Sequence, residues 1–277
     1  MEAVGTGGEA ARSGDGRAEE GAERSTGGRG DGLGVALVTG ASRGLGAAIA
    51  RRLAADGRPV AVNYRSNAEE AGAVVRGIRA AGGTAEAFAG DVTDEAAVAG
   101  LVAAVTARLG PVGVLVVNAT GPQPLVPVAE LTWRDELDQL EFFVKSPTLL
   151  VRAVLPGMRA LGGGRIVQIT SDTVARLLPE NSAYTAAKAA QHALTGVWAR
   201  ELGPAGITVN NVAPGWIPVE RHAGIPAAER AAYTAAVPLG RMGRPEDAAA
   251  AVAYLASGAA AFVTGQTLTV NGGHTLG

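Results

Sequence analysis

The feature that most constrains the fold is a regular alternation of short β-branched segments with longer alanine-rich segments, which begins at Leu33. The β-branched segments are nearly continuous apolar runs, as expected for strands that are buried on both faces of a sheet. The segments between them carry apolar residues at helical spacing. An alternation of this kind is typical of βαβ units, which build a mostly parallel sheet with helices on both faces.

We therefore predict an α/β protein: a single-domain, doubly wound Rossmann fold with a seven-stranded, mostly parallel sheet. The predicted strands are 35–39, 60–64, 84–89, 114–118, 165–170, 208–212 and 267–270. The predicted helices are 44–56, 67–81, 94–109, 130–159, 182–203 and 245–256, and a loop and helix are expected over 216–236.

The first 32 residues have a different composition from the rest of the chain. They hold ten glycines, seven acids and four arginines, with almost no sizeable apolar side chain. Ordering a residue costs about 1–2 kcal/mol, which such a segment does not recover by burial. We predict a disordered tail over 1–32, either a neutral extension or a docking arm, ahead of a cofactor-binding domain over 33–277. The tail has no apolar core of the kind found in a secretory signal.

Composition excludes several classes of function. The absence of cysteine removes disulfides, thiolate catalysis and thiolate metal sites. A net charge of −2 argues against a nucleic-acid footprint or a polybasic membrane surface, and no apolar run approaches the length of a membrane span. The three histidines, His192, His222 and His274, are too scattered to suggest a metal site. We expect a cytoplasmic protein without a metal.

A glycine-rich turn follows the first predicted strand and opens the first predicted helix. Its glycines are Gly40, Gly44 and Gly46. The first permits a tight turn, the second lets the backbone approach a pyrophosphate, and the third lets helix and strand pack closely. Phosphates would bind over the helix N-terminus, where free N–H groups and the helix dipole favour anions.

The spacing of this turn and several later motifs resemble the short-chain dehydrogenase/reductase family, and the likeness covers essentially all of 33–277. The matching motifs, in chain order, are TGxxxGxG at 39–46, Asp91-Val92, Asn118-Ala119, Ser171, YxxxK at 184–188, Pro214-Gly215, and a C-terminal signature from 238–241 through 270–273. Thr120 replaces the glycine that usually follows the Asn-Ala pair. Within the family the likeness is greatest to 3-oxoacyl-[acyl-carrier-protein] reductases and polyketide ketoreductases.

The resemblance implies a catalytic site of Ser171, Tyr184 and Lys188. Reduction of a ketone needs a proton at the developing alkoxide, and a tyrosine with an ordinary pKa near 10 supplies and recovers it poorly at neutral pH. Lys188 follows Tyr184 by one helical turn, so both side chains lie on one helix face and the ammonium would lower the tyrosine pKa. Ser171 would hydrogen-bond the substrate carbonyl.

The segment after the second strand indicates the cofactor. Enzymes of this fold that use NAD usually carry an acid there, whereas this chain has Asn63-Tyr64-Arg65-Ser66 and no acid before Glu69. Arg65 and Arg43 could bind a 2′-phosphate, which favours NADP(H). The residues predicted to bind the cofactor are Gly40, Ser42, Arg43, Gly44, Leu45, Gly46, Asn63, Tyr64, Arg65, Ser66, Asp91, Val92, Asn118, Ala119, Thr120, Tyr184, Lys188, Pro214, Gly215 and Ile217.

Two positions depart from the family pattern. Many members carry a catalytic asparagine in the long helix before the serine, where this chain has Phe143, and no asparagine occurs between Asn118 and Asn181. Val219 stands where the family often has threonine near the nicotinamide carboxamide. The first departure predicts a different proton supply.

Three functions are consistent with the sequence. The leading one is an NADPH-dependent ketoreductase acting on a 3-oxoacyl or polyketide-like carbonyl, with a ketone or acyl thioester as substrate and a carrier protein as candidate partner. The second is an alcohol or sugar dehydrogenase, and the third is a weakly catalytic NADP-binding sensor or scaffold. Segments 121–125 and 216–236 are expected to line the substrate site. The resemblance also implies a homo-oligomer, a tetramer or a dimer.

Overall fold

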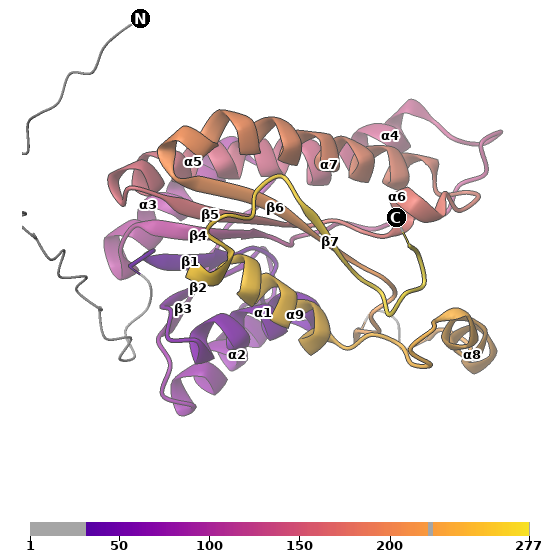
Figure 1. Cartoon of the computed structure of the whole chain (residues 1–277), viewed down its shortest axis with the longest axis horizontal. Coiled ribbons are helices and arrows are strands. Elements are labelled where there is room, and N and C mark those ends of the chain that lie inside the picture. Colours follow the sequence, from indigo (N-terminus) through magenta and orange to yellow (C-terminus); the bar gives the residue numbers. More distant parts are fainter. Residues whose placement is uncertain (1–31, 221–223, 277) are drawn as a thin grey trace, which may run out of the picture.

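The computed structural model describes residues 32–220 and 224–276, so all of the predicted tail except Gly32 lies outside the described residues. Seven strands form one sheet (Figure 1). The strands are β1 (Val35–Val38), β2 (Val60–Tyr64), β3 (Ala85–Ala89), β4 (Val112–Val117), β5 (Gly164–Ile169), β6 (Ile207–Pro214) and β7 (Thr267–Val270).

The sheet order is β3-β2-β1-β4-β5-β6-β7, and all six neighbouring pairs are parallel. This confirms the predicted doubly wound Rossmann fold, with a sheet that is parallel throughout. The chain moves outward in one direction from β1 to β3 and in the other from β4 to β7. Between β1 and β4 the connections therefore diverge, which opens a crevice at the carboxyl ends of these strands.

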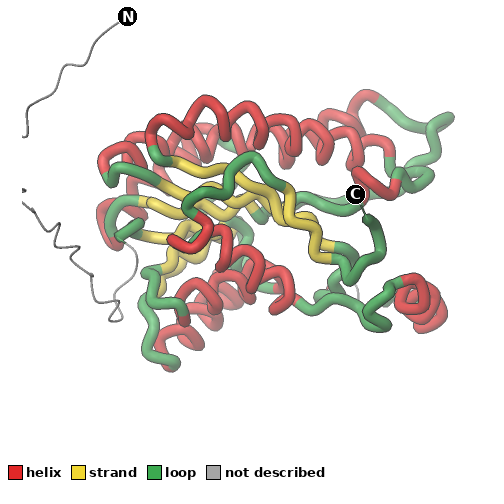
Figure 2. Tube along the Cα trace, in the orientation of Figure 1, coloured by secondary structure: helices red, strands yellow, loops and turns green. Residues whose placement is uncertain are grey.

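Helices cover both faces of the sheet (Figures 1 and 2). On one face lie α1, α2 and α9, and on the other lie α3, α4, α5 and α7. The helices are α1 (Gly44–Ala55), α2 (Ala68–Ala80), α3 (Glu95–Leu109), α4 (Trp133–Leu140), α5 (Ser146–Ala160), α6 (Thr173–Arg176), α7 (Ser182–Leu202), α8 (Ala227–Ala236) and α9 (Pro245–Leu255). The short helix α8 stands apart from both layers, near the carboxyl ends of the strands.

Alternate residues of each strand point to opposite faces, which divides the apolar interior into two clusters. In β1, Ala36 and Val38 pack toward α1, α2 and α9, whereas Val35 and Leu37 pack toward α3, α5 and α7. All four are at most 1% exposed. Burial on both faces explains why the strands read as continuous apolar runs in the sequence.

The single helix predicted over 130–159 is wrong in detail. Helical structure in this segment begins only at Trp133, the first residue of α4, where Thr132 caps the N-terminus through a capping box with Asp135. Between α4 and α5 lies a π-helical turn, η1 (Glu141–Lys145). Pro147, in the first turn of α5, has no N–H to bond the Phe143 carbonyl four residues earlier, which weakens the α-helical pattern there. π-helical turns occur frequently at functional sites.

Within the described part of the chain, no helix combines the length and the apolar character needed to cross a bilayer.

Candidate functional site

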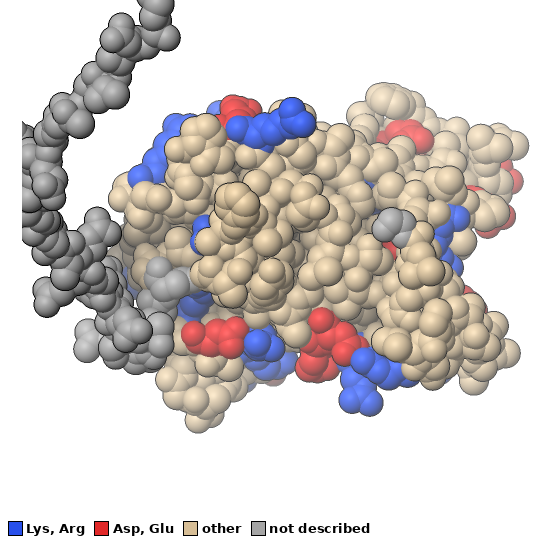
Figure 3. Space-filling view, in the orientation of Figure 1, with Lys and Arg blue, Asp and Glu red and all other residues tan. Residues whose placement is uncertain are grey.

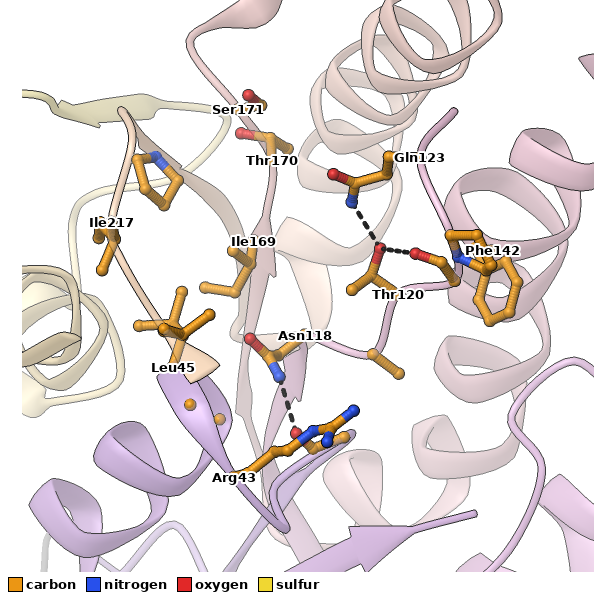
Figure 4. A pocket seen from close by; sticks show the side chains of 18 of the residues that line it. Arg43, Leu45, Asn118, Thr120, Gln123, Phe142, Ile169, Thr170, Ser171 and Ile217 are labelled. Atoms are coloured by element: carbon orange, nitrogen blue, oxygen red, sulfur yellow. Dashed lines mark hydrogen bonds between the residues drawn. The ribbon is translucent and has the colours of Figure 1, made fainter. Parts of the chain in front are cut away.

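A cavity of about 650 Å³ lies at the carboxyl ends of the strands. Every residue predicted from the sequence to be catalytic or to bind the cofactor lines it. Figure 4 shows Arg43 at one end of this cavity and Ser171 at the other, with Asn118 between them. The structure thus brings together residues from the carboxyl ends of strands β1 to β6 and from helix α7, while their roles remain predictions.

The glycine-rich turn between β1 and α1 forms the floor of the cavity. Gly40 and Gly44 adopt left-handed backbone angles, with φ of 60° and 54°. A Cβ on Gly46 would lie 2.3 Å from the Gly40 carbonyl oxygen and 2.5 Å from Asn118 Nδ2, so no larger residue fits. The helix α1 begins at Gly44, with its free N–H groups at the cavity. This geometry fits the pyrophosphate of a dinucleotide.

An anionic side chain of this chain already lies at that helix N-terminus. The Gly44 N–H donates to Glu220 Oε1 at 3.4 Å, and Val219 lies beside it, 3.4 Å from where a Gly44 Cβ would stand. A carboxylate at this position shows that the turn accommodates negative charge, as a phosphate-binding turn must.

Thr39 fixes the ends of β1 and β4 relative to each other. Its fully buried hydroxyl accepts hydrogen bonds from the N–H groups of Asn118 at 2.9 Å and Ala119 at 3.0 Å. In return, Asn118 Nδ2 donates to the Thr39 carbonyl at 2.9 Å and the Gly40 carbonyl at 3.2 Å. The floor and the central wall of the cavity are therefore one hydrogen-bonded unit.

The far end of the cavity carries the residues predicted to hold the adenosine half of the cofactor. Asn63 is buried there and bonds backbone on both sides, accepting from the Gly40 N–H and donating to the Gly90 carbonyl. Arg65 lies 3.9 Å from Asp91, and its side chain is 66% exposed. Burial raises the pKa of Asp91, but two hydrogen bonds from Thr93 and the charge of Arg65 hold it below its ordinary value.

Ser171, Tyr184 and Lys188 meet at the opposite end. Ser171 follows β5, and its Oγ accepts a hydrogen bond from the Thr173 N–H at 3.2 Å. Tyr184 and Lys188 are one turn apart on α7, with Lys188 Nζ 5.7 Å from the centre of the Tyr184 ring. The lysine is only 3% exposed, and its ammonium donates to the Ile169 carbonyl at 2.7 Å.

Phe143, at the position where the family often has asparagine, contacts both Tyr184 and Lys188. The lysine Nζ lies 3.7 Å from the centre of the Phe143 ring, a cation–π geometry. The same ring meets the Tyr184 ring edge to face at 5.4 Å. Phe143 is 2% exposed and does not line the cavity, so it supports the two side chains from behind.

A line of buried polar side chains continues from Lys188 into the core. The ammonium donates to Gln191 Oε1 at 3.1 Å, Gln191 donates to Gln168, and Gln168 donates to Thr195. Thr195 in turn donates to Asn211 at 2.7 Å. This network fixes the orientation of the Gln191 amide, so that its oxygen faces the ammonium.

The sequence predicted the walls near the substrate in part. From segment 121–125, Gly121, Pro122 and Gln123 line the cavity, and from segment 216–236 Trp216, Ile217, Val219 and Glu220 do. Tyr233 instead lies behind Trp216, meeting its ring edge to face at 5.2 Å and accepting its backbone N–H at 2.7 Å. His222 lies outside the described residues.

Sequence reasoning missed several residues of this wall. Besides Phe142, the wall includes Asp172, Thr173, Arg176, Leu178 and Asn181. All five follow Ser171 within ten positions, in the loop around α6 that leads to α7. Their closeness to the predicted serine was the one available signal.

Asp172 sits in a buried polar cluster behind Ser171. Burial raises the pKa of Asp172, although a hydrogen bond from Asn271 and the charges of Arg176 and His274 oppose this. His274 Nδ1 lies 3.8 Å from its carboxylate. Among the residues that the structure describes, no group of three or more histidine and acidic side chains could hold a metal ion.

Comparison with known proteins identifies the class. A family model described as enoyl-(acyl carrier protein) reductase matches residues 40–275. The chain is 42% identical to a cis-4-hydroxycyclohexanecarboxylate dehydrogenase from Sinomonas cyclohexanicum over 244 residues, which cover 87% of this chain and 96% of that protein. It is 39% identical to the 3-oxoacyl-[acyl-carrier-protein] reductase FabG of Staphylococcus aureus over 240 residues, covering 86% and 96%.

The solved structures agree with this result. A gluconate 5-dehydrogenase from Burkholderia cenocepacia, in complex with NADP and tartrate, matches with a TM-score of 0.81 at 32% identity, covering 87% of this chain and 94% of that one. The chain belongs to the short-chain dehydrogenase/reductase family. It is an oxidoreductase that uses a nicotinamide cofactor.

Proposed function

We propose that the protein is an NADPH-dependent reductase of ketones. The observation that carries this proposal is that Ser171, Tyr184 and Lys188 line one end of a cavity whose other end holds the glycine-rich turn with Arg43 and, after β2, Arg65. NADPH, when bound, supplies the hydride that reduces the carbonyl carbon. The overall change is ketone plus NADPH plus a proton to secondary alcohol plus NADP⁺.

In this proposal the three side chains handle the carbonyl oxygen. The Ser171 hydroxyl donates a hydrogen bond to it and holds it beside Tyr184. The Tyr184 hydroxyl donates the proton as negative charge develops on that oxygen, a role that contributes roughly 10²–10⁴ in rate. The phenolate left behind is stabilised by the Lys188 ammonium on the same helix face. Phe143 and Gln191 hold that ammonium in place.

The preference for NADPH over NADH rests on Arg43 and Arg65. Both line the far end of the cavity, and no acid follows β2 before Glu69. Paired guanidinium groups bind a 2′-phosphate with charge-assisted hydrogen bonds. The test is to measure KM for both cofactors at one ketone concentration. We expect a much lower KM for NADPH, and equal use of both would refute the assignment.

For the substrate we propose a 3-oxoacyl or polyketide-like carbonyl, as in the FabG relative. The wall beside the catalytic end includes Pro122, Phe142, Leu178 and Trp216, which suits an apolar ketone. NADPH oxidation with acyl thioesters, quinones and simple cyclic ketones tests the proposal. It fails if none of these ketones accelerates NADPH oxidation.

The second candidate is oxidation of a secondary alcohol or sugar. Two of the similar proteins are named as dehydrogenases, one acting on a hydroxycyclohexane carboxylate and one on gluconate. Comparing kcat/KM in both directions for each ketone–alcohol pair distinguishes this candidate. A catalytically weak NADP-binding scaffold would instead bind NADPH without turning over either set.

We also propose a homo-oligomer formed through the edge of the sheet at β7. Exposed apolar side chains gather near it, with Phe262 fully exposed, Leu268 39% exposed and Tyr254 45% exposed. A broad area of the face that carries β7 shows neither acids nor bases (Figure 3). Such patches mark protein interfaces. Light scattering should give a dimer or tetramer, and Phe262→Asp should shift it toward monomer.

A carrier-protein partner and a cytoplasmic location stay predictions.

A further inference from the structure

Arg176 is a cation at the catalytic end of the cavity that the proposed mechanism does not use. It ends the single helical turn α6, and its backbone N–H bonds the Asp172 carbonyl at 3.1 Å, so it lies about one turn beyond Ser171. The side chain is half-buried and lines the cavity. The other three cavity-lining cations in the described chain are Arg43 and Arg65, at the far end, and Lys188.

The guanidinium of Arg176 is held in place without using its hydrogen-bond donors. It stacks over the Tyr233 ring, with Cζ 5.5 Å from the ring centre. Within the described part of the chain it donates no hydrogen bond, and no carboxylate lies within 4.0 Å of it. Asp172 is close enough to interact with its charge, but that carboxylate is bonded by Asn271 instead. The planar donors of Arg176 remain open to a ligand.

The loop that follows Arg176 is under local backbone constraint. Leu177 has a φ of 49° and Glu180 a φ of 62°, and these are the two non-glycine residues of the described chain with left-handed angles. The Glu180 carbonyl accepts the Val126 N–H at 2.7 Å, which joins this loop to the opposite wall. Strained residues of this kind persist where the surrounding structure fixes them, often beside a binding site.

We propose that Arg176 binds a carboxylate on the substrate, so that the preferred substrates are keto acids or the corresponding hydroxy acids. The ketone oxygen lies at Ser171 and Tyr184 while the carboxylate pairs with the guanidinium, across a wall that is otherwise largely apolar. A single guanidinium matches one carboxylate in charge and in its two-pronged geometry. This inference rests on the proposed function and narrows its substrate class: among ketones of the 3-oxoacyl or polyketide-like type and related carbonyl compounds, those with a free carboxylate are preferred over neutral thioesters.

The test compares keto acids with their uncharged methyl esters. The probes are 4-oxopentanoate, 5-oxohexanoate, 6-oxoheptanoate and 4-oxocyclohexanecarboxylate, each beside its methyl ester, with an acetoacetyl thioester as a neutral reference. For at least one acid we expect a KM about 10- to 100-fold below that of its ester, as a charged hydrogen-bonded pair provides. Arg176→Met should abolish that difference by raising KM for the acid far more than KM for its ester, and Arg176→Lys should restore part of it.

A matched control is Arg152→Met, because Arg152 is exposed on α5 and pairs with Glu95 away from the cavity. It should leave the preference for acids intact. If Arg176→Met lowers activity on acids and esters alike, or if the wild type shows no preference for any acid, Arg176 has only a structural role and the inference is overturned while the reductase function stands.

A binding measurement separates this inference from the function itself. Each acid is titrated against the NADPH-bound protein while the cofactor fluorescence is followed. If no ketone is reduced but acids bind in a manner that depends on Arg176, the reductase function fails and the carboxylate site stands. If acids neither bind nor react differently from esters, the site fails.

Discussion

Replacing Phe143 by leucine tests how Lys188, the lysine of the proposed mechanism, is held. The Lys188 ammonium is almost fully buried, with its Nζ 3.7 Å from the centre of the Phe143 ring. Leucine keeps apolar volume but removes the negative face of the ring. A desolvated cation–π contact contributes about 2 kcal/mol, which corresponds to roughly 1.5 pKa units at 1.36 kcal/mol per unit.

The expected effect is on the pH profile of alcohol oxidation, in which Tyr184 must be a phenolate to accept the proton. An ammonium that is less well held stabilises the phenolate less, so the tyrosine pKa rises. The oxidation activity, which falls as the pH is lowered and Tyr184 becomes protonated, should then begin to fall at a higher pH. We expect the acid limb of the kcat profile to move up by about one pH unit, which is less than the roughly 1.5 pKa units that correspond to the whole cation–π contact.

The assay is steady-state NADP⁺ reduction between about pH 5 and 10, a range that extends from well below the ordinary tyrosine pKa up to that value. Phe142→Leu is the control, because Phe142 lines the cavity while Phe143 is the ring against Lys188. It should alter substrate KM and leave the acid limb in place. A Phe143→Leu protein whose kcat falls at every pH, with an unmoved acid limb, would refute the positioning role.

Three other changes follow from the same geometry. Arg43→Ala and Arg65→Ala should each raise KM for NADPH about 10- to 100-fold with little change for NADH, since each removes a charged partner of the 2′-phosphate; equal losses with both cofactors would contradict this. Thr39→Val removes the acceptor of two partly buried N–H groups and should lower the free energy of unfolding, measured by urea denaturation, by about 1–3 kcal/mol; a loss within error would contradict this. Asp172→Asn should gain stability relative to the wild type as the pH rises above about 4. The raised pKa of the Asp172 carboxyl stabilises the wild-type fold below the unfolded-state pKa, and that contribution is lost as the pH rises through the folded-state pKa. If the melting temperatures of the two proteins change in parallel with pH, the prediction is wrong.

The sequence was sufficient to predict the strands and the glycine-rich turn that lines the cavity. Strands buried on both faces leave continuous apolar runs, so their ends agree with the structure to within two residues. The glycine turn was predictable because its left-handed backbone angles and close approaches, such as that of Gly46 to Gly40, require glycine.

The remaining features depend on contacts between distant segments. The π-helical turn carries no periodic signal of its own, and it places Phe143 against Lys188 only because α5 and α7 pack on the same face of the sheet. Arg176 reads in the sequence as an ordinary polar residue after a predicted serine. Its place beside the cavity depends on a contact with Tyr233 of α8, whose ring lies beneath the guanidinium and is distant from it in the sequence.

The most direct test of the account is a single turnover of Tyr184→Phe with bound NADPH and a ketone that the wild type reduces. The change removes only the phenolic oxygen and leaves the other predicted cofactor contacts in place, so NADPH should still bind, as measured by cofactor fluorescence. Oxidation of NADPH, followed by nicotinamide absorbance, should slow by roughly 10²–10⁴, the contribution of a positioned general acid. A single-turnover rate within about tenfold of the wild type would contradict the assignment of Tyr184 as the proton donor, and with it the proposed mechanism.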